Sequence, residues 1–335
     1  MLCYSLYLFS KYTQTMDSIT HIVLGAALGE LILRKRTGNK GAILGAIIAT
    51  IPDLDILLLP FFDDYQRIVI HRGYTHSLLF CLLAAMALSI WLKWISWTKD
   101  VSRPVLFLFS FLALITHLLL DVFTPYGTQL FLPFSNARVT FDNITVIDPI
   151  YTIPILVGLL ISWNIIKIKR FRSFANKAGL LISLCYLLFT LINKQLVNKQ
   201  FDKALAISNI QYSSMMTVPV TAGSIKWYAV AKTDSAIYIG NLNILKMNEG
   251  ISFEKFDINE HLLNYIDDDL AVRMRWFAKD FYVVNEYKGK LVLYNLQCDM
   301  QGVRYYQDYK APTAFYFEFD KNRGKTKEYE TGFHE

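Results

Sequence analysis

The organisation of the N-terminal part is decided by residues 71–97, "HRGYTHSLLFCLLAAMALSIWLKWISW". Two histidines and an arginine stand directly before an apolar run of about 20 residues, the length that crosses the hydrocarbon core of a bilayer. Ionisable side chains are costly at the edge of a membrane span, so His71, Arg72 and His76 need either structural partners or a function. The pattern predicts a transmembrane helix with a functional group of residues at one end.

Similar apolar runs recur along the first 193 residues, which hold most of the hydrophobic side chains of this 335-residue chain. We expect an α-helical membrane domain of about six helices. The candidate spans are 19–33, 41–60, 77–97, 104–124, 149–168 and 178–193.

The C-terminal part has the composition of a water-soluble domain. Short β-branched and aromatic runs such as "FYVVNEYKGKLVLYNL" alternate with Gly, Asp and Lys, which predicts hairpins and an antiparallel sheet in a small α+β module. The expected divisions are a possible N-terminal extension over 1–15, a membrane domain over 16–195 and an extramembrane domain over 196–335. Met16 opens "MDSITHIVLGAALG", a more natural start than Met1.

The distribution of Lys and Arg predicts the orientation in the membrane. Three connections between spans are rich in basic residues, whereas the alternating ones are poor in them. The positive-inside rule places the basic connections in the cytoplasm. The basic residues are Arg34, Lys35, Arg36 and Lys40, then Lys93, Lys99 and Arg103, then Lys167, Lys169, Arg170, Arg172 and Lys177. We expect a multi-pass protein of the cytoplasmic (inner) membrane, with the C-terminal domain on the outer side.

On that map, histidines and aspartates from four span ends meet at the outer face. "THLLLD" places His117 and Asp121 four residues apart on one helix face, a spacing that suits two ligands of one ion and also a helix-end ion pair. "IPDLDILLLP" places Asp53 and Asp55 in an apolar run, where Pro52 predicts a helix break and either aspartate could instead cap a helix or face headgroup water. Three histidines complete the set, namely His71, His76 and His21, which follows Asp17 by four residues. Asp142 and Asp148 are further carboxylates nearby.

Imidazoles mixed with carboxylates favour a divalent transition metal, with zinc preferred over manganese or iron. The four cysteines form no CxxC pair, which argues against thiolate zinc sites and disulfides. More than four candidate ligands suggest a two-metal site, which typically ionises water for hydrolysis. Arg72 and Asp121 are the candidate catalytic residues. The guanidinium of Arg72 would stabilise charge that develops on a phosphoryl or acyl oxygen.

These motifs resemble the YdjM-like family of membrane-bound metal-dependent hydrolases. The likeness runs in order through "MDSITH", "PDLD", "HRGYTHS", "HLLLDVFTPYG" and "LPFS…IDPI" and covers about residues 16–155. The family is similar, more distantly, to zinc-dependent phospholipases C and single-strand nucleases. The resemblance implies hydrolase activity and metal-ligand roles for seven residues, namely His21, Asp53, Asp55, His71, His76, His117 and Asp121.

The favoured interpretation is hydrolysis of a phosphoester, possibly lipid-linked, at the outer face, with the lipid bilayer as the other partner and no sign of nucleic-acid binding. A transporter or ion channel remains an alternative, because aspartates inside membranes often mark ion paths. An intramembrane metalloprotease is disfavoured by the missing HExxH motif. A non-catalytic anchor for a partner-binding C-terminal domain is the fourth interpretation.

Overall fold

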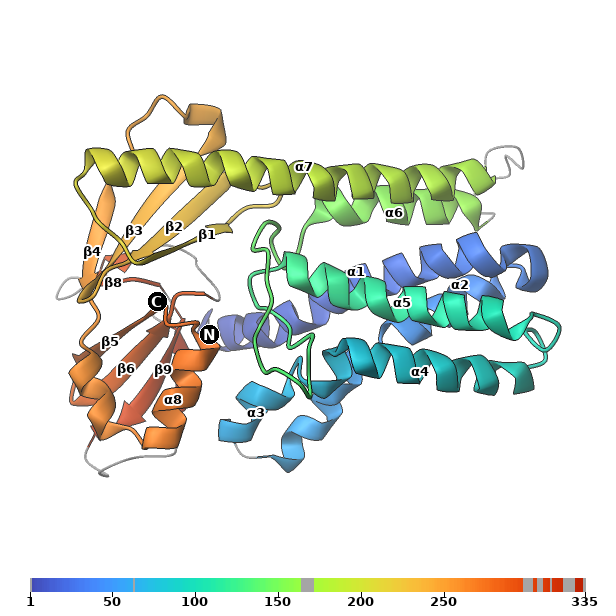
Figure 1. The fold of residues 1–335 in the computed structure, drawn as a ribbon, viewed down its shortest axis with the longest axis horizontal. Helices are drawn as coiled ribbons and strands as arrows, with labels where there is room; N and C mark the ends of the chain where they lie inside the picture. Colours follow the sequence, from blue (N-terminus) through green and yellow to red (C-terminus); the bar gives the residue numbers. More distant parts are fainter. Residues whose placement is uncertain are drawn as a thin grey trace. The chain divides into compact units, whose positions relative to one another are not determined.

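The structure, a computed structural model, describes residues 2–62, 64–163, 172–297, 304–305, 310–313, 315–321 and 329–333. Helices make up the first two thirds of the chain and strands dominate the rest (Figure 1). In chain order the helices are α1 (Leu2–Thr37), α2 (Lys40–Ala49), η1 (Pro52–Phe61), α3 (Asp64–Ile70), η2 (Tyr74–His76), α4 (Leu78–Trp91), η3 (Leu92–Trp94), α5 (Arg103–Phe123), α6 (Pro149–Ser162) and α7 (Arg172–Ile207).

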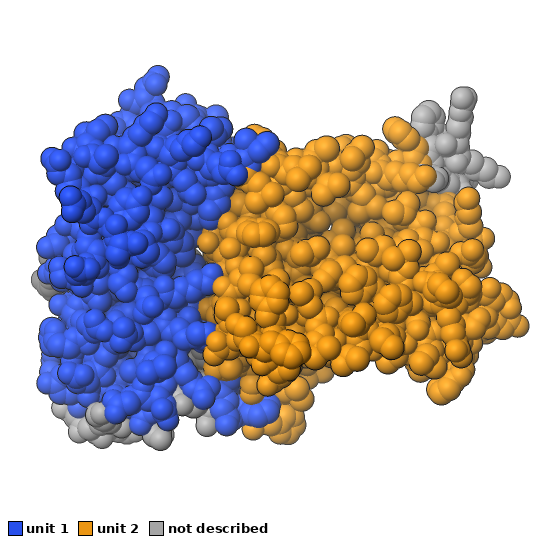
Figure 2. All heavy atoms as spheres, viewed as in Figure 1, with its two compact units in different colours: residues 1–8, 62–68, 192–335 blue, residues 9–61, 69–191 orange. Residues whose placement is uncertain are grey.

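The chain divides into two compact units, which are coloured separately in Figure 2. The helical unit comprises residues 9–61 and 69–191, and the second unit comprises residues 1–8, 62–68 and 192–335. α7 contributes its first part to the helical unit and its last part to the second unit.

The second unit contains antiparallel sheets, as predicted. One sheet has the order β1-β2-β3-β4 and the other β10-β9-β6-β5, with the short pair β7-β8 beside them. Trp227 of β2 is buried against Val197 and Phe201 on the last part of α7. The remaining elements are β1 (Ser214–Pro219), β2 (Lys226–Lys232), β3 (Ala236–Asn243), η5 (Ile244–Lys246), β4 (Phe253–Asp257), η6 (Glu260–Tyr265), α8 (Asp268–Phe277), β5 (Tyr282–Tyr287), β6 (Lys290–Asn295), β7 (Arg304–Tyr305), β8 (Lys310–Ala311), β9 (Phe315–Asp320) and β10 (Glu330–Phe333).

α5 is the central helix of the helical unit, and it carries part of the candidate site. Its side chains at Leu106, Phe109, Leu114 and Leu118 are completely buried. They belong to one apolar cluster with residues of α2 and of α4, including Ile48. Burial against several neighbours holds α5 rigidly, so its last turns are a firm support for ligands.

The structure supports fewer membrane spans than the six predicted. Within the described ranges, α5 and the segment Phe174–Ile207 of α7 are long and apolar enough to cross a membrane, and α2 with η1 adds a third if that bent pair is one span. Leu78–Trp94 and α6 are shorter apolar helices. Predicted spans 19–33 and 178–193 lie inside the longer helices α1 and α7. Residues 164–168 of the predicted span 149–168, and the basic residues Lys167, Lys169 and Arg170, lie outside the described residues.

The predicted break at Pro52 is present. α2 ends at Ala49, and a 3-10 helix begins at Pro52 after a bend of 45°. Proline has no amide hydrogen to continue an α-helix and restricts the residue before it, so the chain changes direction there. The bend leaves Asp53 and Asp55 on η1, in the helical unit that contains the histidines.

α1 and α2 approach each other through glycines. A Cβ built on Gly25 would collide with the backbone oxygen of Gly45, and one built on Gly29 would collide with that of Gly41. Small residues permit this close approach, which is typical of helix packing in membranes. The contact fixes the position of α2, whose Ala49 carbonyl contacts the site described below.

Substitution of Gly29 by alanine should therefore destabilise the protein. The new methyl group would overlap backbone atoms that cannot rotate away, so α1 and α2 must separate, and we expect a loss of at least about 2 kcal/mol. The midpoint of thermal unfolding in detergent would measure it. Gly250→Ala is the matched control, because a Cβ there meets nothing within 4 Å. Equal unfolding midpoints for the two variants would contradict the packing described.

Candidate metal centre

Four elements of the helical unit bring imidazoles and carboxylates together. α1 supplies His21, η1 supplies Asp53, η2 supplies His76, and α5 supplies His117 and Asp121 from adjacent turns. All but Asp53 are buried, and the Asp53 side chain retains 15% of its exposure. Two overlapping sets of these side chains could hold a metal ion, namely His21 with His117 and Asp121, and Asp53 with His76 and His117.

The ligand atoms of the second set, extended by Asp121, have nearly equal separations. Nε2 of His76 and Nε2 of His117 lie 3.3 Å apart. Oδ1 of Asp53 lies 3.5 Å from the His76 nitrogen and 3.4 Å from the His117 nitrogen. Oδ2 of Asp121 lies 3.4 Å and 3.5 Å from the same two nitrogens. Asp53 and Asp121 therefore each lie within 3.5 Å of both histidine nitrogens.

The separations within the set of Asp53, His76 and His117 suit a zinc ion. When three ligand atoms lie about 3.4 Å apart, a point about 2.1 Å from all three exists, and this is the usual length of bonds from zinc to imidazole nitrogen and carboxylate oxygen. The charges agree as well, since Asp53, Asp55 and Asp121 against Arg72 leave two formal negative charges when the histidines are neutral. A divalent cation would neutralise this buried group, and the residues present therefore fit such an ion.

His117 and His76 are held in the tautomer that binds metal through Nε2. His117 Nδ1 lies 2.7 Å from the carbonyl oxygen of Ala49, which can only accept, so Nδ1 carries the hydrogen and Nε2 keeps its lone pair. His76 Nδ1 lies 3.0 Å from Thr75 Oγ1 and 3.6 Å from Oδ2 of Asp55. Burial lowers the pKa of His76, because desolvation of the imidazolium outweighs the attraction of the nearby carboxylates.

Asp121 presents its second oxygen to a different pair of groups. Oδ1 lies 3.2 Å from His21 Nε2 and 3.2 Å from an Nη atom of Arg72. The His21 ring is stacked on that of His117 with the centroids 3.6 Å apart. One carboxylate thus joins both metal-capable sets to an arginine.

Arg72 is held in place by its backbone and by its side chain. Its φ of 55° lies in the left-handed region, which non-glycine residues seldom adopt and which is often found at functional sites. Its amide donates to Asp55 Oδ2 at 2.9 Å, and its guanidinium donates to Thr124 Oγ1 at 3.3 Å and lies 4.9 Å from the ring centroid of Tyr126. The charged group is therefore fixed beside Asp121.

Asp55 and His71 are close to the centre but outside both sets. Asp55 is buried and accepts from the Arg72 amide and from Thr75 Oγ1. His71 Nδ1 lies 3.3 Å from Asp55 Oδ1, and its ring meets the edge of Tyr126. Asp55 thus faces the Nδ1 side of His76 rather than the Nε2 side, where the other ligand atoms gather.

The other predicted carboxylates lie elsewhere. Asp148 caps α6 by accepting from the Ile150 amide and accepts from the Tyr186 hydroxyl at 2.6 Å, while Asp142 accepts from Thr140. The side chain of Asp17 lies outside those that the structure describes.

Three contacting residues were not predicted from the sequence. Ser18 donates to Asp53 Oδ2 at 3.2 Å, Thr75 bridges His76 and Asp55, and Tyr126 packs against His71 and Arg72. All three stand inside quoted motifs, "MDSITH", "HRGYTHS" and "FTPYG". Their positions beside the ionisable residues are the one signal in the sequence that could have found them.

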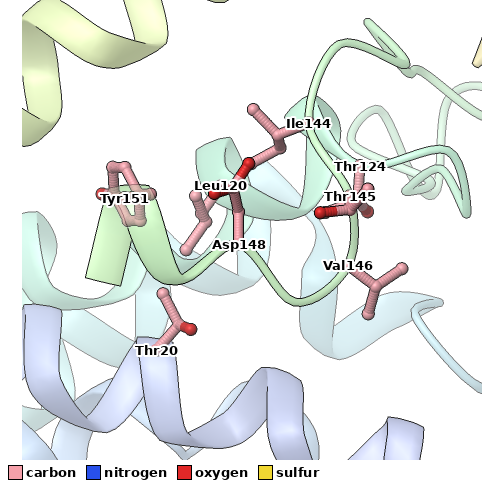
Figure 3. Close-up of a pocket in the computed structure, with 8 residues that line it drawn as sticks. All are labelled: Thr20, Leu120, Thr124, Ile144, Thr145, Val146, Asp148 and Tyr151. Atoms are coloured by element: carbon pink, nitrogen blue, oxygen red, sulfur yellow. The ribbon is translucent and has the colours of Figure 1, made fainter. Parts of the chain in front are cut away.

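A small pocket is lined by residues that are adjacent in sequence to two members of the candidate metal centre. Thr20 and Leu120, the neighbours of His21 and Asp121, line it together with Thr124, Asp148 and Tyr151 (Figure 3). It has room for about one water molecule.

Comparison with known proteins points to one family. The family model described as YdjM inner membrane protein matches residues 16–197, more than half of the chain. The chain is 33% identical over 153 residues to the uncharacterized protein YfhP of Bacillus subtilis, covering 44% of this chain and 46% of YfhP. It is 32% identical over 114 residues to the inner membrane protein YbcI of Escherichia coli, covering 32% of this chain and 61% of YbcI. The matches span less than two thirds of either relative, and no solved structure matches.

Proposed function

The chain belongs to the YdjM inner membrane protein family, and from this premise and the ligand geometry we propose that it is a membrane-bound, metal-dependent hydrolase of phosphoesters. The proposal rests on one observation, the group formed by Asp53, His76 and His117, whose ligand atoms lie 3.3, 3.4 and 3.5 Å from one another, with Asp121 Oδ2 at 3.4 and 3.5 Å from the two histidine nitrogens. Apart from the Asp53 side chain, which is 15% exposed, these groups are buried, and a buried set of lone pairs without a cation would be costly. The active site is proposed to lie at the outer membrane–water interface.

We propose one ion per chain rather than the two suggested by the number of candidate ligands. Both metal-capable sets use His117, whose Nδ1 is engaged by the Ala49 carbonyl, so only Nε2 can bind. A second ion beside His21 would need Oδ1 of Asp121, which already faces the Arg72 guanidinium at 3.2 Å. Arg72 thus supplies positive charge where a second cation would otherwise lie.

These residues define the proposed chemistry. A zinc or manganese ion held there polarises a phosphoryl oxygen and lowers the pKa of water, so that hydroxide is available near neutral pH. Asp121 orients the Arg72 guanidinium, and this guanidinium stabilises negative charge on the phosphoryl group as it develops. Asp55 and Thr75 fix the His76 ring, and Ala49 fixes the His117 ring.

Elemental analysis of the purified protein tests the proposal directly. We expect about one zinc or manganese ion per chain and hydrolysis of phosphomonoester or phosphodiester test substrates that a chelator abolishes and added metal restores. The Asp53→Asn variant should lose both properties. A wild-type protein that contains no transition metal, and binds none on addition, would overturn the proposal.

His71 and Asp55 should act differently from the ligands. Both lie outside the metal-capable sets. His71→Asn, which changes a residue that contacts Asp55, should therefore keep most of its bound metal. Asp55 orients a ligand, and Asp55→Asn should lower the metal affinity by about 10- to 100-fold. Metal competition with a chromogenic chelator would measure both affinities. If His71→Asn instead loses its metal as fully as Asp53→Asn does, His71 is a ligand, as the sequence motif suggested.

A metal-ion transporter is the second candidate. A polar group of buried Glu30 and Ser162 with partly exposed Arg34 lies further along the helical unit and could continue an ion path. However, Glu30 is nine residues from His21, about 13 Å along α1, and buried apolar side chains including Val23 and Leu24 lie between them. Uptake of zinc into proteoliposomes that is lost in Asp53→Ala would favour transport over hydrolysis.

A further inference from the structure

The last part of η1 is apolar and exposed, although its first turn carries site residues. Asp55 is buried and Asp53 belongs to the metal-capable set, whereas Leu57 is 66% exposed and Phe61 82% exposed. A 3-10 helix has three residues per turn, so Asp55, Leu58 and Phe61 share one row, and burial changes along the length of η1 rather than around it. The exposed apolar side chains of this segment are Leu54, Leu57, Leu58 and Phe61, which we call the η1 apolar face.

The position of the centre along α5 places it at the edge of the membrane. A 21-residue helix is about 31 Å long, and the hydrocarbon core of a bilayer is about 30 Å thick. Asp121 is in the last turn of α5 and His117 in the turn before, so both lie near one boundary of the core. Ester and phosphate groups of lipids occupy that depth.

η1 itself is continuous with the membrane part. It follows α2 after a bend of 45°, and the two together are apolar enough to form one broken span or a re-entrant segment. Either arrangement would place the η1 apolar face against the hydrocarbon core, where acyl chains are the occupant that suits it. Asp53, the most exposed residue of the two metal-capable sets, stands next in the chain to Leu54 of this face.

We infer that the substrate is a phosphoester carried on a hydrocarbon chain, which reaches Asp53 from the bilayer along the η1 apolar face. This inference rests on the proposed hydrolase function and narrows its substrate class to membrane amphiphiles. The hydrocarbon chain lies against Leu57 and Phe61, and its phosphoryl group lies beside Asp53 and Arg72. A soluble phosphoester lacks the part of the molecule that this face contacts.

Matched substrates that differ only in chain length test the inference. The protein in nanodiscs would be given dioleoyl and dihexanoyl forms of phosphatidic acid and of phosphatidylglycerol, which cover a phosphomonoester and a phosphodiester. We expect metal-dependent turnover of at least one dioleoyl form, exceeding that of its dihexanoyl partner by about tenfold or more. Equal turnover, or faster turnover of the dihexanoyl form, overturns the inference and leaves the hydrolase proposal intact. Turnover of neither pair by a protein that hydrolyses the phosphoester test substrates overturns the inference alone, and turnover of none of these substrates overturns both.

A variant of the η1 apolar face gives a second arm. Leu57→Asn should lower turnover of the dioleoyl form by about tenfold and leave that of the dihexanoyl form unchanged, because Leu57 touches only the hydrocarbon chain in this arrangement. Leu245→Asn, at an exposed position of the second unit, is the control and should change neither. An equal loss on both chain lengths in Leu57→Asn would contradict the inference.

A third readout does not depend on activity. A nitroxide label at position 57, in a variant whose native cysteines are replaced by serine, should collide more with oxygen than with a water-soluble nickel complex when the protein is in nanodiscs. A label at position 245 should show the reverse. If the label at position 57 is as accessible to nickel as the label at 245, η1 lies in water and the inference is wrong.

Discussion

The His117→Ala variant should contain almost no bound metal. His117 Nε2 lies within 3.5 Å of His76 Nε2, Asp53 Oδ1 and Asp121 Oδ2, and it belongs to both metal-capable sets, so no arrangement of the remaining residues restores it. We expect the affinity for zinc to fall by more than about 100-fold, because loss of a ligand exceeds the effect of losing a residue that orients one. Hydrolysis should fall to background.

Elemental analysis and zinc competition would measure this effect in detergent. His261→Ala is the matched control, since His261 is an exposed histidine of the second unit. The unfolding midpoint of His117→Ala without metal should be compared with that of the metal-stripped wild type, to separate metal loss from unfolding. Retention of a full equivalent of metal by folded His117→Ala would refute the proposed metal site.

The Arg72→Gln variant should keep its metal and lose its activity. Arg72 contributes no ligand atom, and its guanidinium is the positive group nearest to Asp121 Oδ1 among the described residues, at 3.2 Å. Removal of a group that stabilises developing negative charge typically lowers kcat by about 100- to 1000-fold. We expect that loss in kcat, with a bound-metal content close to that of the wild type.

Arg138→Gln is the control that the fold offers. Arg72 and Arg138 both lie against the Tyr126 ring, at 4.9 Å and 5.0 Å from its centroid, but only Arg72 is within ion-pair distance of Asp121. Arg138→Gln should therefore retain most activity. Because Arg72 also holds Asp55 through its amide, which glutamine retains, a metal-free Arg72→Gln would show that the guanidinium acts in ion binding rather than on substrate.

The sequence predicted the residue types of the site and their place at one end of the membrane helices. Histidine and aspartate in apolar runs are costly, so their repetition at several span ends by itself indicates a common role. The antiparallel sheets were predictable because alternation of side chains is a local property of strands. Six spans are not confirmed, since within the described residues two helices, or three with the bent pair, are long and apolar enough to cross a membrane, and 78–94 and 149–162 are shorter apolar helices.

Only the tertiary structure decided which of the candidates face one another and through which atoms. The motif "PDLD" does not distinguish its two aspartates. In the structure, after the bend at Pro52, Asp53 lies on the Nε2 side of His76 and Asp55 on the Nδ1 side. Likewise, the pairing of Arg72 with Asp121 depends on a left-handed backbone at Arg72 and on α5. Sequence patterns report the environment of each residue along its own segment, whereas a metal site depends on distances between segments, which are set by how closely glycine-lined helices such as α1 and α2 pack.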